Sequence, residues 1–274
     1  MSLAPASLVL RGAASLLSLA GASVTAVFAP GLGRVPVTRR ADDRSLAIVI
    51  PAYCERDNII ATLENVAAAL APLGIPHEIL VIDDGSTDDT AELVAAYARR
   101  HPAVTLLRNP RNMGFGWTYR RGVEAASMAH IVMVHGDNAW PAASLRELFG
   151  RIGDADVIIG YTRDMWHTRP WMRTVLSKTF TGTINVITRR RLKYYNGLQI
   201  HAAPVLKSMV IESSGHGFQA EVLVKSLRPD TTVVEVPMDL MERARGESKA
   251  FRVKNVIDVS RTLARLVALE WTRK

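Results

Sequence analysis

The sequence predicts an α/β fold in which helices flank a mostly parallel β-sheet, and two observations carry this prediction. Short apolar runs alternate with helical patterns in steps of about 25 to 30 residues, as expected for strands joined by crossover helices. The apolar runs are continuous rather than alternating with polar residues, which is typical of strands covered on both faces. With 48% hydrophobic and 22% charged residues, the chain can bury a sizeable core. We expect one globular domain over residues 45–250.

The first half of that domain shows the alternation most clearly. Strands are predicted at residues 46–50, 79–82, 104–107 and 131–134, and helices at 59–70, 87–97 and 117–126. The first helix rests on apolar residues at three- and four-residue steps, and the second carries Asp88 and Asp89 where the helix dipole favours acidic groups. A fourth helix is predicted to begin near Pro141.

After Pro141 the regular alternation of predicted strands and helices ends. Strands are predicted at residues 157–160 and 233–237, and between them residues 164–193 are basic and aromatic. Residues 251–274 form a third unit, in which 251–271 read as an amphipathic helix with cationic residues on its polar side. Such a helix either packs on the domain or lies on an anionic membrane, and the periodicity is the same for both.

Residues 1–44 are predicted to be an apolar leader and linker. Residues 12–29 carry no charge and just reach the lower length limit for a membrane span. Three interpretations stay open for them: an interfacial or packing helix, a weak membrane anchor, and a disordered leader. Proline, glycine and mixed charges over residues 30–44 indicate a linker.

The net charge and the cysteine content limit the possible partners and the cellular compartment of the protein. The net charge of +8 favours an anionic partner, such as a phosphorylated small molecule, an acidic lipid surface or nucleic acid. No recognisable nucleic-acid module accompanies the basic residues, so we expect no nucleic-acid partner. The single cysteine, Cys54, excludes an internal disulfide and fits a reducing compartment.

Polar residues follow each of the four N-terminal strands at the point where the strand ends. Ligands of open parallel sheets bind beyond these carboxyl ends. The four segments are Pro51–Glu55, Asp83–Ser86, Asn109–Gly114 and His135–Asn138. Each carboxylate alone also fits a helix cap or a turn. Their occurrence at consecutive strand ends favours a ligand site, because a purely structural sheet has no reason to collect them there.

The groups at these strand ends suit a nucleotide-sugar. One carboxylate can accept hydrogen bonds from the base and the ribose, and another can hold a divalent ion on the diphosphate. Such an ion neutralises the departing nucleoside diphosphate, which is a main demand of glycosyl transfer.

In order along the chain, these segments resemble family 2 glycosyltransferases of the GT-A (Rossmann-like) fold, most of all the polyprenyl- or dolichyl-phosphate mannose and glucose synthases. The likeness spans roughly residues 46–250, and the Asp83-Asp84-Gly85-Ser86 turn is its most specific string. Later segments extend it: Tyr195–Gln199, Gly217–Glu221 and Glu242–Lys249.

The resemblance implies roles for individual residues. The implied nucleotide-sugar contacts are Pro51, Ala52, Tyr53, Glu55, Ile82, Asp84, Gly85, Ser86, Asn112, Gly114 and Gly136. Asp137, with His135, would bind Mn²⁺ or Mg²⁺, and the catalytic set would be Asp137, Arg243 and Lys249. The acceptor or its phosphate would contact Gln219, Glu221, Arg243, Ser248 and Lys249. Within the Asp-Asp pair, we expect Asp84 rather than Asp83 to meet the nucleotide.

The sequence departs from the family pattern at the metal end. The usual Asp-x-Asp is replaced by His135-Gly136-Asp137, and Ala139 stands where the family has glutamine. Histidine binds manganese but is a poorer magnesium ligand and carries no negative charge. Cys54 also replaces a common asparagine.

The resemblance implies an inverting transfer from a UDP- or GDP-sugar to a polyprenyl phosphate. A phosphate acceptor is already an oxyanion, whereas a hydroxyl acceptor needs a general base, for which Glu221 and Asp239 are the candidates. Two other functions stay open: the same chemistry with a soluble small-molecule acceptor, and a non-catalytic nucleotide-sugar binder. The expected location is cytoplasmic, with peripheral contact at the cytoplasmic face of the membrane as one form of it.

Overall fold

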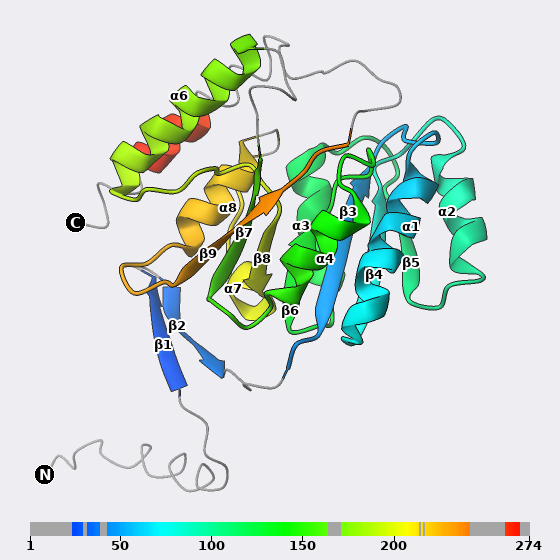
Figure 1. Ribbon diagram of the computed structural model, residues 1–274, viewed down its shortest axis with the longest axis horizontal. Coiled ribbons are helices and arrows are strands. Elements are labelled where there is room, and N and C mark those ends of the chain that lie inside the picture. The colour runs from blue at the N-terminus through cyan, green and yellow to red at the C-terminus, as the bar shows by residue number, and fades with distance from the viewer. Residues whose placement is uncertain are drawn as a thin grey trace, which may run out of the picture.

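A mixed, mostly parallel sheet of seven strands organises the molecule (Figure 1). The computed structural model describes residues 24–29, 32–38, 43–163, 171–213, 215, 217–241 and 261–268. The strand order is β5-β4-β3-β6-β8-β7-β9, and β8 alone in this sheet runs antiparallel to its neighbours. The predicted α/β class and the parallel pairing of the first strands are therefore confirmed.

The first half of the sheet is built from four strand–helix units. Its elements are β3 (Leu46–Ala52), α1 (Ile59–Leu70), the 3-10 turn η1 (Ala71–Leu73), β4 (His77–Asp83), α2 (Thr90–Ala98), β5 (Val104–Arg108), α3 (Phe115–Ala125), β6 (His130–Met133) and α4 (Ala142–Gly150). Each predicted strand and helix of this half is present, with ends shifted by a few residues. The helix after β4 starts at Thr90, so Asp88 and Asp89 precede it rather than lie in its first turn.

The second half contains two strands that the sequence predicted and several elements that it did not. Its elements are β7 (Val157–Thr162), α6 (Trp171–Thr188), β8 (Gln199–Ala202), α7 (Ala203–Lys207), α8 (Phe218–Ser226) and β9 (Val233–Met238). The sequence predicted β7 and β9 and assigned no element to residues 171–188 or 203–207. Of β8, only Gln199 belonged to a segment that the sequence singled out, Tyr195–Gln199, and no strand was predicted there.

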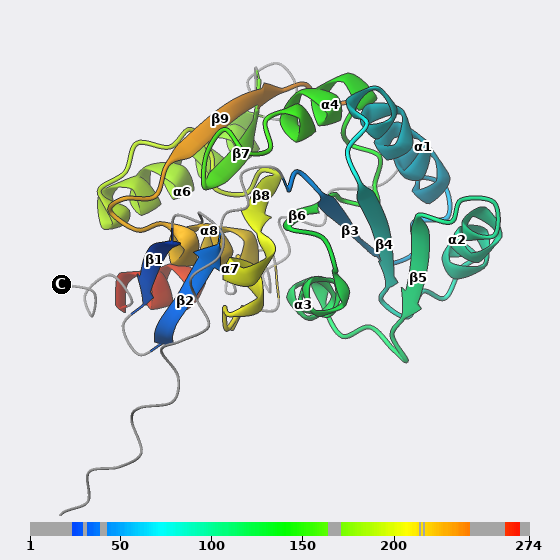
Figure 2. The same ribbon diagram turned by 90° about the horizontal axis from the view of Figure 1, so that it is seen from below.

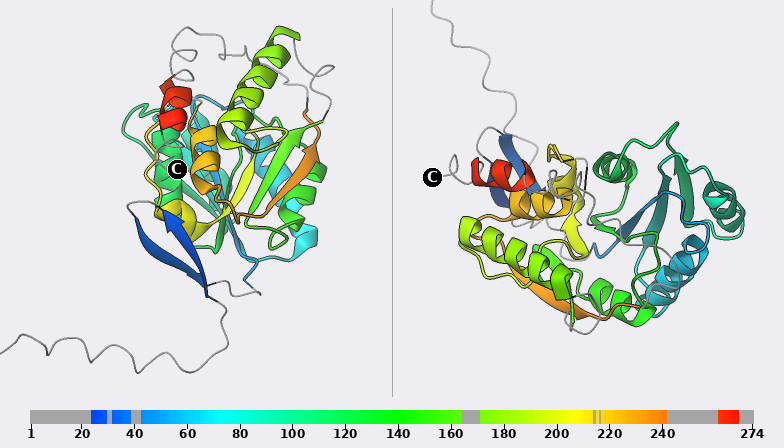
Figure 3. Two further views of the ribbon diagram at one scale, coloured as in Figure 1. Left: turned by 90° about the vertical axis from the view of Figure 1, so that its left-hand side faces the viewer. Right: turned by 90° about the horizontal axis from the view of Figure 1, so that it is seen from above.

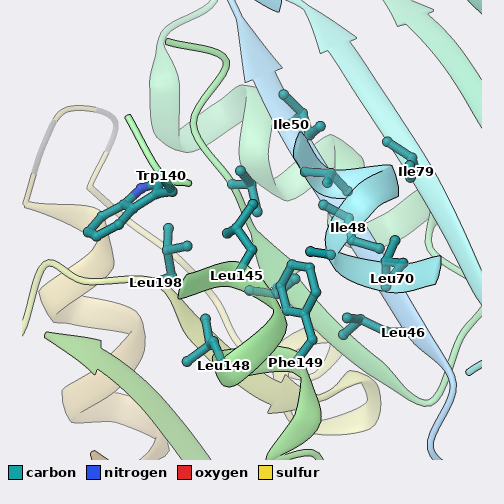
Figure 4. Close-up of a cluster of buried hydrophobic side chains, with 14 of the residues drawn as sticks. Leu46, Ile48, Ile50, Leu70, Ile79, Trp140, Leu145, Leu148, Phe149 and Leu198 are labelled. Carbon is teal, nitrogen blue, oxygen red and sulfur yellow. The ribbon is translucent and has the colours of Figure 1, made fainter. Parts of the chain in front are cut away.

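Helices cover both faces of the sheet, as the continuous apolar strands predicted (Figure 2). Along β3, Leu46, Ile48 and Ile50 pack in the cluster that includes α1 and α4 (Figure 4). The alternate residues Ala47 and Val49 pack on the other face, against α3, α7 and Phe218. Because successive side chains of a strand point to opposite faces, a strand buried on both sides must be apolar throughout.

The termini differ from the sequence prediction. The predicted linker over residues 30–44 contains a strand, β2 (Leu32–Thr38), which pairs antiparallel with β1 (Val24–Ala29). The uncharged segment 12–29 therefore ends in a strand, and its residues 12–23 lie outside the described part of the chain.

The predicted C-terminal helix is described over residues 261–268. Thr262 and Leu266 of this helix are buried, and Leu266 packs in the same cluster as α8 residues Ala220 and Leu223. The described part of the helix thus packs on the domain. α8 lies between it and α6 (Figure 3).

Candidate active site

The segments predicted to bind the nucleotide and the metal gather at one edge of the sheet. β3, β4, β5 and β6 are mutually parallel, so the loops that follow them emerge on the same side. β7 and β9 run parallel to each other and send their following segments to that edge as well. The four segments that follow the strands of the first half therefore lie together beyond the carboxyl ends of those strands, as predicted.

Hydroxyl side chains join the loop after β3 to the loop after β4. The backbone N–H of Cys54 donates to Ser86 Oγ at 2.9 Å, and the N–H of Glu55 donates to Thr90 Oγ1 at 2.9 Å. Cys54 has a φ of 55°, a conformation that non-glycine residues adopt only where their surroundings fix it. Ser86 thus acts on the loop that presents Tyr53, whose side chain is exposed at the site.

The two aspartates of the Asp83-Asp84 pair have different environments. Asp83 is fully buried, forms an ion pair with Arg108 of β5 at 3.2 Å, and accepts the backbone N–H of Ser86. Asp84 accepts hydrogen bonds from the backbone N–H groups of Met113 and Gly114 at 2.8 and 3.0 Å, and from the side chain of Asn109. Both aspartates hold neighbouring loops in place. A contact between Asp84 and the nucleotide stays a prediction, and a carboxylate has acceptor directions enough for both roles.

The turn at Gly85 depends on glycine. Gly85 has a φ of 71°, and a β-carbon at this position would lie 2.6 Å from the backbone of Arg111. The turn therefore lets the loop after β5 approach closely. Beside it, an open pocket of about 520 Å³ is lined by Gly85, Ser86, Thr87, Arg108, Asn109 and Pro110. Of the predicted contact residues, only Gly85 and Ser86 line that pocket.

Helix α1 positions the loop that carries His135 and Asp137. Thr62 Oγ1 donates to the carbonyl of Gly136 at 3.0 Å and accepts the backbone N–H of Asn138 at 3.0 Å. The side chain of Asn65 donates to that of Asn138 at 2.7 Å, and Asn138 has a φ of 53°. A side chain on this helix therefore holds both ends of the short segment around Asp137.

The metal-end loop lies against the nucleotide-end loop. A β-carbon on Gly136 would be 3.3 Å from the carbonyl oxygen of Pro51 and 3.5 Å from Ala52 Cβ. His135 and Asp137 are half-buried, and the ring of Phe115 meets the ring of His135 edge-on at 5.5 Å. The predicted metal pair is thus beside the predicted nucleotide contacts.

Protein side chains alone do not complete a metal site in the described residues. Among them, no group of three or more His, Cys, Asp or Glu side chains is placed to hold an ion. One carboxylate and one imidazole fit Mn²⁺ when the oxygens of a bound diphosphate supply further ligands. The donor set therefore suits an ion that arrives with its substrate.

The segment after β9 returns to the metal-end loop. The backbone N–H of Met241 donates to the carbonyl of Ala139 at 2.9 Å, and that of Asp239 donates to Ser144 Oγ at 3.0 Å. Arg243, Ser248 and Lys249 follow directly and lie outside the described residues. Their segment begins next to the loop of Asp137.

Gln219 and Glu221 form hydrogen bonds with other parts of the protein. Gln219 is buried and donates to the carbonyl of Gly197. Glu221 is 1% exposed and accepts the backbone N–H groups of Glu212 and Ser213 and the ammonium of Lys225. The burial of Glu221 acts to raise its pKa, but these hydrogen bonds outweigh it and hold the pKa below the ordinary value.

Of the two candidates for a general base, Glu221 has a lowered pKa, which makes its carboxylate a weaker base. Asp239 forms an ion pair with Arg163 at 3.2 Å at the protein surface. The state of Glu221 agrees with an acceptor that is already ionised.

Sequence analysis missed the residues that position the site. Thr62 sits among the apolar residues of α1, and Thr90 begins an ordinary helix, so neither carries a local signal. Asn109 was noted only as part of a strand end. Its side chain bridges Asp84 and Thr118 and also receives a hydrogen bond from Arg121.

Comparison with known sequences identifies relatives over most of the chain. Residues 47–212 match the family described as Glycosyl transferase family 2. Polyprenol monophosphomannose synthase of Mycolicibacterium smegmatis is 29% identical over an alignment of 238 residues, gaps included, that covers 80% of this chain and 85% of that protein. Dolichol-phosphate mannosyltransferase of Pyrococcus furiosus is 28% identical, over 82% of this chain and 64% of that protein.

Solved structures show the same fold. Glucosyl-3-phosphoglycerate synthase of Mycobacterium tuberculosis in complex with UDP aligns with a TM-score of 0.62 at 18% identity, covering 82% of this chain and 80% of that one. Its complex with Mn²⁺, UDP-glucose and phosphoglyceric acid aligns with a TM-score of 0.62 at 17% identity over the same shares of the two chains. Separately, none of the helices in the described part of the chain combines the length and the apolar character needed to cross a membrane.

Proposed function

The chain belongs to glycosyl transferase family 2, and from that premise we propose that it moves a sugar from a UDP- or GDP-sugar to a polyprenyl phosphate, with inversion at the anomeric carbon. It is a nucleotide-sugar-dependent glycosyltransferase, as its family and its relatives agree. The acceptor is proposed from the relatives, which include a polyprenol monophosphomannose synthase and an undecaprenyl-phosphate mannosyltransferase.

The observation in the structure that supports the proposal most directly concerns the two carboxylates that could act as a general base. Glu221 is tied to two backbone N–H groups and Lys225, and Asp239 pairs with Arg163. A hydroxyl acceptor needs a base, whereas a lipid phosphate attacks as an oxyanion. The phosphate acceptor therefore fits the carboxylates that are present.

In the proposed mechanism, the chain mainly binds and orients. Tyr53 and Glu55 face the base and ribose, with Asp84 at the same end. Asp137 and His135 would hold a divalent ion, which neutralises the charge of the departing nucleoside diphosphate. Arg243, Ser248 and Lys249 would place the acceptor phosphate for displacement at the anomeric carbon.

A soluble phosphorylated acceptor is the second candidate. It is favoured by the likeness in fold to glucosyl-3-phosphoglycerate synthase, whose structure contains phosphoglyceric acid. Both acceptors carry a phosphate, so the same basic residues could bind either. They differ in the lipid chain, and a transfer to the hydroxyl of phosphoglyceric acid would also need a general base.

An acceptor assay separates the two candidates. The protein is incubated with UDP- and GDP-sugars and Mn²⁺ or Mg²⁺, with a short polyprenyl phosphate, with 3-phosphoglycerate, or with neither. We expect nucleoside diphosphate release that depends on the lipid phosphate. Release that depends on 3-phosphoglycerate instead would transfer the assignment to the second candidate, and donor binding without turnover under every condition would contradict both.

Asp137→Asn tests the metal assignment. The amide keeps the size of the side chain but removes its charge, so we expect turnover to fall on the order of a hundredfold or more. Asp154→Asn is the matched control, because Asp154 is an exposed carboxylate paired only with nearby Arg151. Equal activity of the two variants would remove Asp137 from the metal site.

A further inference from the structure

The outward face of α6 is apolar. Five of its exposed side chains are large and hydrophobic, with exposed fractions of 69% for Trp171, 53% for Met172, 42% for Val175, 55% for Leu176 and 81% for Val186. A helix on the surface of a protein ordinarily turns a charged or polar face to water. This helix does the opposite over its first two turns and again at Val186.

The exposed residues form one continuous stripe. At 3.6 residues per turn, the five apolar side chains share a side of the helix with the small or uncharged residues Thr179, Gly182 and Thr183, which are also exposed. The opposite side contains buried Thr174 and Ile184, and Ile184 packs with α8. The stripe is therefore the part of the α6 surface that remains exposed after the helix packs on the domain.

Charge around the stripe has one sign. Residues 171–193 contain six basic residues and no aspartate or glutamate. Lys178 and Arg189 are exposed on α6 or directly after it. Apolar side chains edged by cationic ones are typical of helices that lie in the headgroup region of anionic bilayers, whereas a protein partner would not require basic residues alone.

The stripe lies toward the active-site edge. α6 follows β7, so its first turns, with Trp171, Met172, Val175 and Leu176, lie toward the edge of the sheet where the parallel strands end (Figure 1). α6 is on the outside of the molecule, at the end away from α2 (Figures 1 and 2). A flat surface can therefore approach this helix and the site edge together.

We propose that the outward face of α6, from Trp171 to Val186, binds an anionic lipid bilayer. The helix inserts its apolar side chains between the headgroups while Lys178 and Arg189 meet lipid phosphates. This assigns the membrane surface to α6, whereas the described part of the C-terminal helix packs its apolar side on the domain. The contact with lipid needs neither the sugar donor nor the acceptor, so it can be tested independently of the proposed reaction.

Vesicle co-sedimentation of the full chain tests the proposal. We expect binding to phosphatidylcholine vesicles that contain phosphatidylglycerol, and much weaker binding to phosphatidylcholine alone. Trp171→Ser and Leu176→Ser should each weaken the partition coefficient by about tenfold, because each removes a side chain that lipid would bury. Leu93→Ser is the matched control, since Leu93 is an exposed leucine on α2 and should leave binding unchanged.

Two further readouts sharpen the result. Lys178→Gln with Arg189→Gln should weaken binding to the anionic vesicles only, and added salt should have the same effect. Brominated lipids should quench tryptophan emission in the parent protein, and Trp171→Phe should keep the binding but lose part of the quenching. Both would tie the contact to this helix.

Three outcomes would overturn the proposal. They are no binding to either vesicle, binding that Trp171→Ser and Leu176→Ser leave intact, and a change from dimer to monomer in these variants with vesicle binding unaltered. Sedimentation velocity without lipid measures the last. None of these depends on sugar transfer, so a parent protein that binds neither vesicle but keeps its lipid-dependent turnover contradicts this inference alone.

Discussion

At the scale of single residues, Gly197 has the least room for a side chain among the glycines in the part of the chain that the structure describes. A β-carbon on Gly197 would lie 1.7 Å from the carbonyl oxygen of Gly160, and the two strands cannot separate without losing the hydrogen bond from Gly160 N–H to Leu198. We expect Gly197→Ala to lower the free energy of unfolding by about 3 kcal/mol or more, measured by urea denaturation.

Gly182→Ala is the control for that substitution. Gly182 lies in α6, and no atom is within 4 Å of the position that its β-carbon would occupy. We expect this variant to be as stable as the parent or more stable by about 0.5–1 kcal/mol, because alanine favours a helix. Equal effects of the two substitutions would show that the close strand contact is not what limits position 197.

Glu221 should give the protein a pH-dependent stability. Its folded-state pKa is lowered, so its contribution is fully present above the ordinary carboxyl pKa and is lost as pH falls through the folded value. Glu221→Gln removes the charge that Lys225 and two backbone N–H groups stabilise, which we expect to cost about 1.5–3 kcal/mol near pH 7.

The measurement is the difference in unfolding free energy between the parent and Glu221→Gln as pH is lowered from 7 into the acid range. The difference should shrink below the ordinary carboxyl pKa. Buried His201, whose pKa burial lowers to about 3, also weakens the fold in acid, but it is common to both proteins and cancels. A difference that stays constant with pH would mean that the charge of Glu221 does not matter.

The sequence predicted the polar residues at the strand ends but not the hydrogen bonds that they form within the protein. The Asp83–Ser86 turn was recognisable because its residue types are rare after a buried strand. That Asp84 holds the backbone of Met113 and Gly114, or that Ser86 holds Cys54, depends on which loops meet in space. Such pairings join positions about 30 residues apart and leave no local pattern.

At the scale of elements, helix α1 has a second task besides packing on the sheet. Its Thr62 bonds to Gly136 and Asn138 on either side of Asp137. We expect Thr62→Val, which keeps the shape and removes the hydroxyl, to weaken the apparent Mn²⁺ affinity of the reaction by roughly tenfold. Maximal turnover at saturating Mn²⁺ should change less than that affinity.

Thr62→Ser should restore most of the Mn²⁺ affinity, because it returns the hydroxyl. A purely structural role would instead lower the stability of Thr62→Val, by about 1–3 kcal/mol, without a separate change in metal affinity. Measuring turnover against Mn²⁺ concentration, together with thermal unfolding, distinguishes the two.

Two elements escaped sequence prediction for physical reasons. β8 has four residues, and two of them, Gln199 and His201, are buried polar side chains bonded to each other, so the strand lacks an apolar run. α6 buries Thr174 and Thr181 beside Ile184 and exposes large apolar side chains such as Trp171 and Leu176. The pattern that usually identifies an amphipathic helix is therefore absent from it.

At the scale of the whole molecule, the two halves of the sheet were not equally predictable. From β3 to β5, each strand pairs with the next one along the chain through a crossover helix, and β6 then pairs with β3 on its other side. Apolar periodicity reveals the strands and helices of this half. Beyond β6, the order β8-β7-β9 mixes antiparallel and parallel pairs. Local periodicity contains no information about which of these strands become neighbours.

The hydrogen bond between Met241 and Ala139 has a consequence for how the protein is made. Residues 46–133, which form β3 to β6, leave the ribosome before the other strands of the seven-stranded sheet and contain strands that pair among themselves. The segment that returns to Ala139 emerges only after β9, about a hundred residues later. A growing chain can thus shape the nucleotide end of its site early, while the phosphate end must wait for the final strand. During translation, the proposed donor contacts would therefore form before the proposed acceptor contacts.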